Sequence, residues 1–355
     1  MLSRRDFGRI AMAAVPATLS AQGGRGRALP KPNSKFAGVQ VGVITYSFMG
    51  VQTADLIPTI VRLGINEVEL MSNHAEALVS APSAAGRGGT PAAAGAGRGA
   101  APVAQAASAA PPPTPWYSGD ACAGRAQPAT GGGRAPAPVN PEIAQWRAAP
   151  ETMNKYRDLR KQFDDVGITL GVLCYNMNAN ISDDEIDYAF RMAQALGVRA
   201  ISSSSTVTVA KRVAAFADKY KLTWSGHGHD DVCDPEQFAK PETFEKIIAL
   251  SPYIGINLDI GHFTAGGYDA VAFIRRHNAR ITNLHLKDRV KNPQGGGRGQ
   301  NLRWGDGETP IKEVLQLMRR QQYTFPANIE YEYQGTDSVI EVAKCLQYCK
   351  DALLG

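Results

Sequence analysis

Two stretches of the sequence combine carboxylates and imidazoles at a spacing that suits a metal ion. Asp259 and His262 stand three residues apart, and Asp288 follows three residues after His285. Oxygen and nitrogen ligands of this kind hold divalent cations in proteins. A cation bound here could act as a Lewis acid on a carbonyl group. The simpler alternative is that Asp259 and His262 form an ordinary hydrogen-bonded pair at a strand end, because buried polar groups generally find such partners.

Polar residues stand at every second position in four segments that have strand patterns. Alternate residues of a strand share one face. The four polar sets are Ser225, His227 and His229; Asn257 and Asp259; Asn283, His285 and Lys287; and Asn328, Glu330 and Glu332. Unpaired carboxylates buried on such a face would destabilise the fold. The pattern therefore predicts a counter-charge, and a divalent ion could supply it.

These segments belong to a longer alternation of strands and helices. Strands are expected at 39–46, 67–71, 168–175, 199–203, 222–226, 254–260, 283–287 and 327–333, and a helical pattern follows each of them. Such alternation predicts a parallel sheet. Eight units, without an insertion of about 60 residues, leave roughly the 250 residues typical of a closed (β/α)8 TIM barrel. An open doubly wound sheet is the alternative, but no glycine fingerprint follows the first strand.

The strand–helix pattern stops between about residues 80 and 140. This stretch consists mainly of Ala, Gly, Pro and Arg, and such a composition buries too little apolar surface to offset its chain entropy. It predicts a disordered insertion after the second strand. A smaller Gly-rich insertion is expected at 293–300, after the seventh strand. A lid or a partner-binding arm is the functional alternative, because long loops are either functional or disordered.

The N-terminus has the arrangement of an export signal. Arg4, Arg5 and Phe7 precede a mild apolar run from Ile10 to Leu19, which predicts a twin-arginine signal over residues 1–28. The run is too short to span a bilayer, so we expect a periplasmic or secreted protein with no stable membrane association after export. The alternative is a basic, flexible N-terminus of a cytosolic protein.

Charge and cysteine content narrow the function classes. Residues 1–28 carry five Arg and one Asp, so they supply +4 of the net charge of +5 and leave +1 for the rest. This balance argues against a nucleic-acid partner, which normally meets a basic face. The five cysteines form no CxxC pair. They are expected to be small buried side chains rather than disulfides or zinc ligands.

Four motifs, LDIGHFTAGGYD, NLHLKD, WGDGETPI and ANIEYEY, occur in this order. In these four motifs the sequence resembles the xylose-isomerase-like sugar isomerase/epimerase family of metal-dependent barrels. The resemblance covers about residues 38–355 apart from the insertions. It implies a divalent metal, Mn, Mg, Co or Zn, with the ligands His227, Asp259, His285 and Glu330. Many relatives carry Glu where His227 stands, and this departure weakens the case for a proton shuttle between two carboxylates.

The resemblance also implies an activity. The expected enzyme is an isomerase or epimerase of a non-phosphorylated sugar or keto-sugar, acting through a metal-stabilised enediolate. The implied catalytic residues are Glu330, Glu332, His227 and His229, and the implied substrate contacts are Glu69, His262 and Lys287. Glu332 could instead pair with a Lys or Arg, and Lys287 with Asp288.

Three other functions remain open. They are a lyase or hydrolase of keto-glycosides, a sugar-binding barrel without catalysis, and a three-zinc nuclease of the endonuclease IV type. The nuclease needs more His and acidic ligands than the sequence supplies. The expected partner is a small sugar, and an oligomer is possible.

Overall fold

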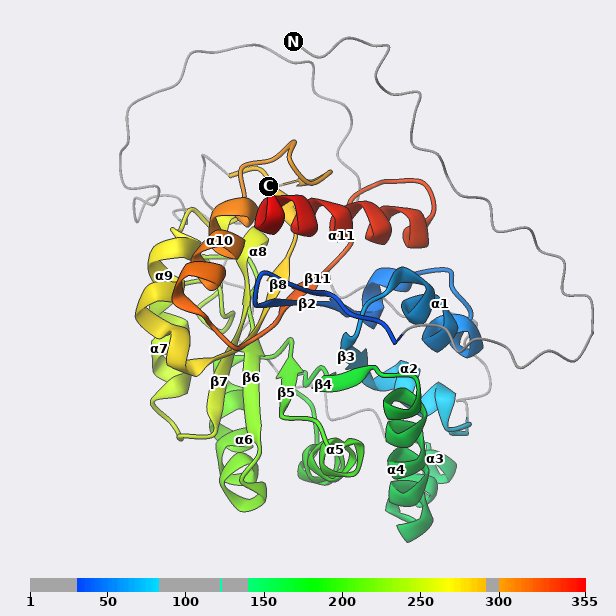
Figure 1. The fold of residues 1–355 in the computed structure, drawn as a ribbon. Helices are drawn as coiled ribbons and strands as arrows, with labels where there is room; N and C mark the ends of the chain where they lie inside the picture. Colours follow the sequence, from blue (N-terminus) through cyan, green and yellow to red (C-terminus); the bar gives the residue numbers. More distant parts are fainter. Residues whose placement is uncertain (1–30, 83–121, 123–139, 292–299) are drawn as a thin grey trace, which may run out of the picture. The chain divides into compact units, whose positions relative to one another are not determined.

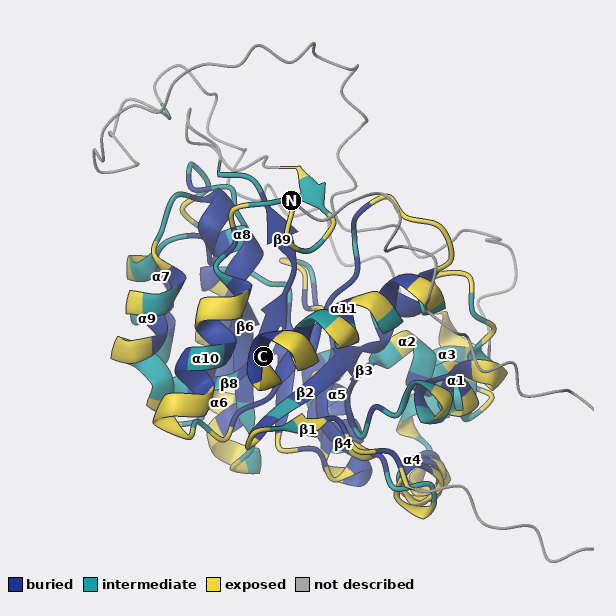
Figure 2. Ribbon diagram, turned by 45° about the horizontal axis from the view of Figure 1, so that its top comes forward, coloured by how far each residue is buried: buried dark blue, intermediate teal, exposed yellow. Residues whose placement is uncertain are grey.

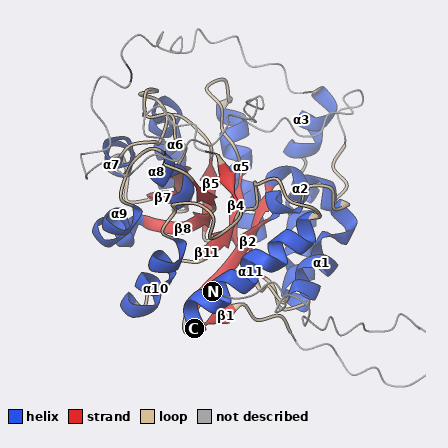
Figure 3. Ribbon diagram, turned by 90° about the horizontal axis from the view of Figure 1, so that it is seen from above, coloured by secondary structure: helices blue, strands red, loops and turns tan. Residues whose placement is uncertain are grey.

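Eight parallel strands close into a barrel that helices surround (Figures 1 and 3). The computed structural model describes residues 31–82, 122, 140–291 and 300–355. The strand order is β2-β11-β8-β7-β6-β5-β4-β3, and β3 pairs again with β2 to close the ring. The prediction of a (β/α)8 barrel is confirmed. The open doubly wound sheet is excluded, because such a sheet would leave β2 and β3 as edges.

The barrel strands are short and regular. They are β2 (Val39–Ile44), β3 (Glu67–Met71), β4 (Thr169–Cys174), β5 (Ala200–Ser203), β6 (Thr223–His227), β7 (Ile254–Asp259), β8 (Ile281–Leu286) and β11 (Ala327–Ile329). Two antiparallel additions lie outside this ring: β1 (Lys35–Phe36) pairs with β2, and β9 (Asp288–Arg289) pairs with β10 (Asn301–Leu302). The first barrel strand ends earlier than expected, because a 3-10 turn occupies Thr45–Phe48.

Helices cover the outer face of the barrel with their apolar sides, and their other sides are exposed (Figure 2). They are α1 (Leu56–Leu63), α2 (Ser72–Leu78), α3 (Pro141–Ala148), α4 (Pro150–Asp165), α5 (Asp183–Leu196), α6 (Val207–Tyr220), α7 (Pro241–Ile248), α8 (Ile260–Ala265), α9 (Ala270–His277), α10 (Ile311–Gln321) and α11 (Ser338–Leu354). Local sequence sets their ends. Helix α5 begins at the expected capping box of Ser182 and Glu185, and it ends at Gly197 with φ +63°, a conformation that glycine adopts without strain. None of the helices in the described ranges is long and apolar enough to cross a membrane.

The two faces of each barrel strand differ in chemistry. In β2, a side chain at Gly42 would lie 2.3 Å from Asn328 Oδ1 inside the barrel. Val41 and Val43 therefore point outward, and both are buried. The main apolar core lies between strands and helices, where Trp224 packs edge-on against Phe238. The interior, by contrast, is largely polar, although most barrels fill it with branched apolar side chains.

The barrel interior holds an ion pair at the end where the strands begin, which we call the lower end. Glu67 of β3 lies 2.6 Å from Arg199, which precedes β5. Gly171 of β4 makes room for this pair, because a Cβ there would stand 1.9 Å from Glu67 Oε1. This end of the barrel therefore neutralises a single buried carboxylate with a single guanidinium.

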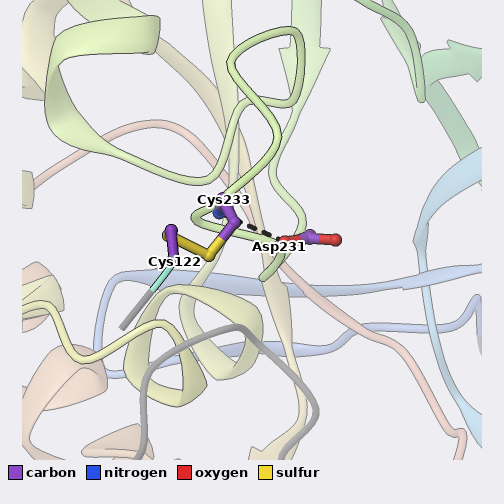
Figure 4. The surroundings of a disulfide bond; sticks show 3 residues. All are labelled: Cys122, Asp231 and Cys233. Carbon is purple, nitrogen blue, oxygen red and sulfur yellow. Dashed lines mark hydrogen bonds between the residues drawn. A yellow bond between two sulfur atoms is a disulfide. The ribbon is translucent and has the colours of Figure 1, made fainter. Parts of the chain in front are cut away.

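A disulfide joins Cys122 to Cys233, in the loop that follows β6 (Figure 4). The expectation of unpaired cysteines is therefore wrong for these two, and it is confirmed for Cys174, Cys345 and Cys349, which are free and buried. The paired cysteines are 111 residues apart. No local spacing reveals such a pair, because bridging depends on the distance between the two Cα atoms, here 5.4 Å.

Several predicted features fall on other parts of the chain. The export signal over residues 1–28 lies outside the described residues. So do nearly all of the predicted insertion between about 80 and 140 and the stretch 292–299.

Candidate metal centre

Four predicted ligands meet at the ends of neighbouring strands. His227 ends β6, Asp259 ends β7, His285 lies near the end of β8, and Glu330 directly follows β11. Each is buried and offers one ligand atom, and these atoms all lie within 4.8 Å of one another. Register explains the convergence, because Asp259 pairs directly with His285 and parallel strands end on the same rim of the barrel.

The donor set suits a divalent ion. It offers two imidazoles and two carboxylates, which are common ligands of Zn²⁺ and Mn²⁺. Asp259 Oδ1 accepts a hydrogen bond of 2.8 Å from the backbone N–H of His262 and caps α8. Asp259 Oδ2 is buried and accepts no hydrogen bond of good geometry from any described residue, although Lys287 Nζ is 3.0 Å away. A buried carboxylate oxygen without a well-aligned hydrogen bond is costly, and a metal ion would satisfy it.

Lys287 lies at the centre of the acidic groups. Only 2% of its side chain is exposed, and its ammonium is 2.9 Å from Glu330 Oε2, 3.0 Å from Asp259 Oδ2 and 2.5 Å from Glu332 Oε2. Burial lowers the pKa of Lys287, but the charges of these three carboxylates outweigh burial and raise the pKa well above its usual value. Lys287 is therefore a cation shared by three acids.

Asp288 faces away from the predicted ligands. It accepts hydrogen bonds from the backbone N–H groups of Gly305, Gly307 and Thr309, at 2.7, 3.0 and 3.1 Å. The sequence placed Asp288 near the metal or next to Lys287. The structure shows that it instead holds the loop that contains the WGDGETPI motif.

His285 bridges two buried carboxylates. Its Nδ1 is 2.8 Å from Glu330 Oε2, and its Nε2 is 2.7 Å from Glu69 Oε2. Burial lowers the pKa of His285, but the charges of Glu69 and Glu330 outweigh burial and raise it well above the usual value. Burial raises the pKa of Glu330, and the charges of Lys287 and His285 reverse this and hold it well below its usual value. Glu330 is thus an anion, and a metal that takes Nδ1 of His285 would replace a proton there.

Glu69 lies beneath the ligands. Its side chain is fully buried. Burial raises the pKa of Glu69, but the charge of His285 and hydrogen bonds from His285, Ser202 and Asn328 lower it below the usual value. All partners that the structure gives this carboxylate are protein groups of the barrel interior. A contact between Glu69 and substrate stays a prediction.

A second group of histidines lies beside the four ligands. His227, His229 and His262 also offer ligand atoms within 4.8 Å of one another. His227 Nδ1 lies 2.9 Å from Asn257 Oδ1 and donates to that carbonyl, which leaves only Nε2 free. His227 can therefore give that nitrogen to one ion at a time.

His229 and His262 are neutral imidazoles at physiological pH. Burial, reinforced by the neighbouring His227 and Lys287, lowers the pKa of His229 to about 3. Burial and the charge of Lys287 hold the pKa of His262 well below its usual value. Each ring can therefore donate one proton and accept another.

Glu332 is the most accessible carboxylate of the centre. Its side chain is 23% exposed, against 7% for Glu330. The sequence left open whether Glu332 meets a cation, and the structure shows that it contacts Lys287. Because Glu332 lies outside the four-ligand group, its carboxylate can meet a substrate while Glu330 holds a metal.

Sequence reasoning missed two residues at this mouth, Arg289 and Tyr46. Arg289 contacts His262 Nδ1 and lies 3.0 Å from Asp230 Oδ2. Tyr46 stands in the 3-10 turn after β2, where burial and the charges of Glu332 and Glu330 raise its pKa. Arg289 follows the predicted strand 283–287 by two positions, where alternation no longer tells which way a side chain points, whereas Tyr46 is the last residue of the predicted strand 39–46 and was read only as part of that strand.

Comparison with known proteins supports the same architecture. Residues 138–349 match the family model described as xylose isomerase-like TIM barrel. None of the curated proteins matches the sequence. Among solved structures, the probable 3-DHS dehydratase AsbF from Bacillus anthracis superposes with a TM-score of 0.55 at 12% identity, over 87% of this chain and 99% of that one.

Two further structures are similarly distant. A zinc-bound IolI protein gives a TM-score of 0.54 at 12% identity, over 89% and 99% of the two chains. A sugar phosphate isomerase/epimerase from Parabacteroides distasonis gives 0.51 at 14%, over 89% and 97%. At these identities the likeness shows the fold alone. The family match covers more than half of the sequence, so the chain belongs to the xylose isomerase-like TIM barrel family.

Proposed function

We propose that this protein is a divalent-metal-dependent isomerase or epimerase of a non-phosphorylated sugar or keto-sugar. The observation that carries the proposal is the meeting of His227, Asp259, His285 and Glu330 within 4.8 Å at the barrel mouth, with Glu332 beside them. A bound Mn²⁺, Mg²⁺, Co²⁺ or Zn²⁺ would supply a Lewis acid that polarises the sugar carbonyl and favours an enediolate.

Glu332 is the proposed base. Glu330 is buried and engaged by both His285 and Lys287, so it serves better as a ligand. Glu332 is more exposed and is oriented by its hydrogen bond to Lys287 Nζ. In this role it takes the proton from the carbon next to the carbonyl.

His229 is the proposed partner on the other side of the substrate. His227 has one free nitrogen, which the metal would take, whereas His229 is neutral and makes a 3.0 Å hydrogen bond to Ser204 through Nε2. A neutral imidazole can pass a proton to or from a sugar oxygen. His262 lies next to it, with ring centroids 5.3 Å apart, and is proposed to bind a substrate hydroxyl.

A second candidate function uses the same groups. Outside the four-ligand group, Asp230 and Asp288 are held by Arg289 and by backbone N–H groups, and Glu69 is fully buried. Glu332 is therefore the one accessible base among the described residues at the mouth, whereas epimerisation needs a proton acceptor on each face. A lyase or hydrolase of keto-glycosides needs only one base: Glu332 removes the proton, and a neutral histidine protonates the departing alcohol. This arrangement favours it as the alternative.

Export is part of the proposal. The Cys122–Cys233 disulfide supports it, because disulfides persist in oxidising compartments. An exported enzyme would meet non-phosphorylated sugars. Fusing residues 1–28 to a reporter tests the signal. We expect the reporter to reach the periplasm and to stay in the cytosol when Arg4 and Arg5 are both replaced by Lys. A reporter with the unchanged signal that stays cytosolic contradicts export.

The activity is tested by hydrogen exchange. Metal-loaded protein is incubated with keto-sugars in D₂O, and NMR follows deuterium at the carbon next to the carbonyl. We expect incorporation that stops when a chelator removes the metal. A new sugar isomer indicates an epimerase or isomerase, and a released alcohol indicates the alternative. One bound metal per chain with no exchange for any candidate contradicts both enzymes and favours a binding barrel, whereas three metals per chain would favour the nuclease.

A further inference from the structure

We propose that Glu69 is a positioning residue that orients both histidine ligands of the metal centre. It belongs to β3, which supplies none of the four candidate ligands, and it reaches them from below. The inference rests on the proposed metal centre, and it adds a specific claim: a single buried carboxylate decides which nitrogen each imidazole presents to the ion.

Glu69 collects hydrogen bonds from four other strands. Its donors are Ser202 Oγ of β5, Asn257 Nδ2 of β7 at 3.5 Å, Asn283 Nδ2 and His285 Nε2 of β8, each at 2.7 Å, and Asn328 Nδ2 of β11 at 2.8 Å. An ionised carboxylate has about four lone-pair sites and only accepts. The four donors at 2.8 Å or less fill this capacity, with Asn257 as a longer contact, and together they hold the carboxylate in one orientation.

The contact with His285 fixes that ring directly. Because Glu69 only accepts, His285 Nε2 must carry a proton. The other nitrogen, Nδ1, faces Glu330 at 2.8 Å and is the one that a metal would bind. A carboxylate behind an imidazole ligand sets its tautomer and ring orientation in this way.

The contact with Asn257 fixes His227 indirectly. Asn257 Nδ2 lies 3.5 Å from Glu69 Oε1 and 3.2 Å from His285 Nε2, and its amide oxygen points the other way, to His227 Nδ1 at 2.9 Å. His227 Nδ1 then carries the proton and Nε2 stays free. Glu69 therefore orients the two candidate ligands so that they offer different ring nitrogens to the metal: Nδ1 of His285 and Nε2 of His227.

The same strand supplies a matched control. Glu67 lies two residues before Glu69 and is also buried inside the barrel, but its partner is Arg199 and it contacts none of the four ligands. A purely structural role for a buried carboxylate predicts similar consequences for Glu67→Gln and Glu69→Gln. A positioning role predicts a difference in metal binding.

The experiment compares Zn²⁺ binding by calorimetry in the parent, Glu69→Gln and Glu67→Gln. We expect Glu69→Gln to weaken Zn²⁺ binding by about 10- to 100-fold and Glu67→Gln to leave it within about threefold. Equal affinity in Glu69→Gln and the parent overturns the inference. A parent that binds no Zn²⁺ instead overturns the proposed metal centre.

Two further measurements apply if Glu69→Gln does not fold. In the Zn²⁺-loaded parent, ¹⁵N NMR of the six histidines should show one ring bound through Nδ1 with a proton on Nε2, and another with the reverse arrangement. Asn257→Ser removes the amide that faces His227 Nδ1 and should therefore alter the His227 signal. Zn²⁺ bound through the same nitrogen of both rings, or an unaltered His227 signal in Asn257→Ser, contradicts the proposal.

Discussion

The two ends of the barrel interior hold their buried charges differently. At the lower end, Glu67 faces one partner, Arg199, whose side chain is 42% exposed. At the mouth, Asp259, Glu330 and Glu332 share the single ammonium of Lys287. His285 lies between Glu330 and Glu69 as a second cation, but four carboxylates beside two cations are a poor way to stabilise a fold. The excess of negative charge at the mouth is therefore best understood as a site for a further cation, whereas the lower end is complete in itself.

The largest expected difference between the two ends is catalytic. Glu332→Gln should slow deuterium exchange by at least about 100-fold, because it removes the proposed base, while Zn²⁺ affinity stays near that of the parent. Glu67→Gln at the lower end should leave the exchange rate unchanged. NMR of the keto-sugar in D₂O measures both. A parent-like rate in Glu332→Gln would assign the base to another group.

Lys287→Met tests the shared ammonium through stability. Without metal, the variant should lose about 3–5 kcal/mol of unfolding free energy, because three carboxylates lose their buried counter-charge. Adding Zn²⁺ should restore a large part of the loss, since an ion at Asp259 and Glu330 replaces the positive charge. Urea unfolding with a chelator and with Zn²⁺ measures this. Equal stability of variant and parent in chelator would show that the mouth needs no counter-charge.

Arg199→Met makes the corresponding change at the lower end, where the effect should be smaller. Because Arg199 is partly exposed, we expect a loss of about 1–2 kcal/mol at neutral pH, and Zn²⁺ should not restore it. Urea unfolding under the same two conditions checks this. Rescue by Zn²⁺ here would remove the distinction between the two ends.

The same variant has an expected pH dependence. Burial raises the pKa of Glu67 above its usual 4.5, and the charge of Arg199 partly opposes this; without Arg199 the folded-state pKa should rise further. An acid with a raised folded-state pKa favours folding while protonated. The deficit of Arg199→Met should therefore be small below pH 4.5 and grow as pH rises through the raised pKa. A deficit that grows toward acid pH would contradict this assignment.

Alternation of polar and apolar residues along the strands was sufficient to predict which strand residues face the barrel interior at the site. It placed Asn257 with Asp259 and Asn283 with His285 on one face, and the structure brings these faces together inside the barrel. The set of four candidate ligands was implied by the resemblance to the family, and parallel strands that end on one rim explain why the four residues meet. The partners of Lys287 could not be predicted, because an ammonium on a long side chain can reach carboxylates from several strands.

Other features depend on contacts that the sequence does not encode locally. Asp288 follows Lys287 directly, but it serves the loop from Gly305 to Thr309 rather than the metal centre. The expected contact between Glu69 and substrate stays a prediction, and the structure adds partners that the sequence did not indicate, among them Asn283 and His285. Both carboxylates are distinguished by their hydrogen-bond donors, and these come from distant parts of the chain.

The bridge between Cys122 and Cys233 turns 111 residues of sequence into a covalent ring that includes α3 to α6 and β4 to β6. A protease that cuts once anywhere inside this ring leaves a single molecule, and the two pieces separate only after reduction. A cut before Cys122 releases a separate N-terminal piece, with or without a reductant. Gel electrophoresis with and without a reductant therefore tells whether a nick lies inside or outside the ring between Cys122 and Cys233.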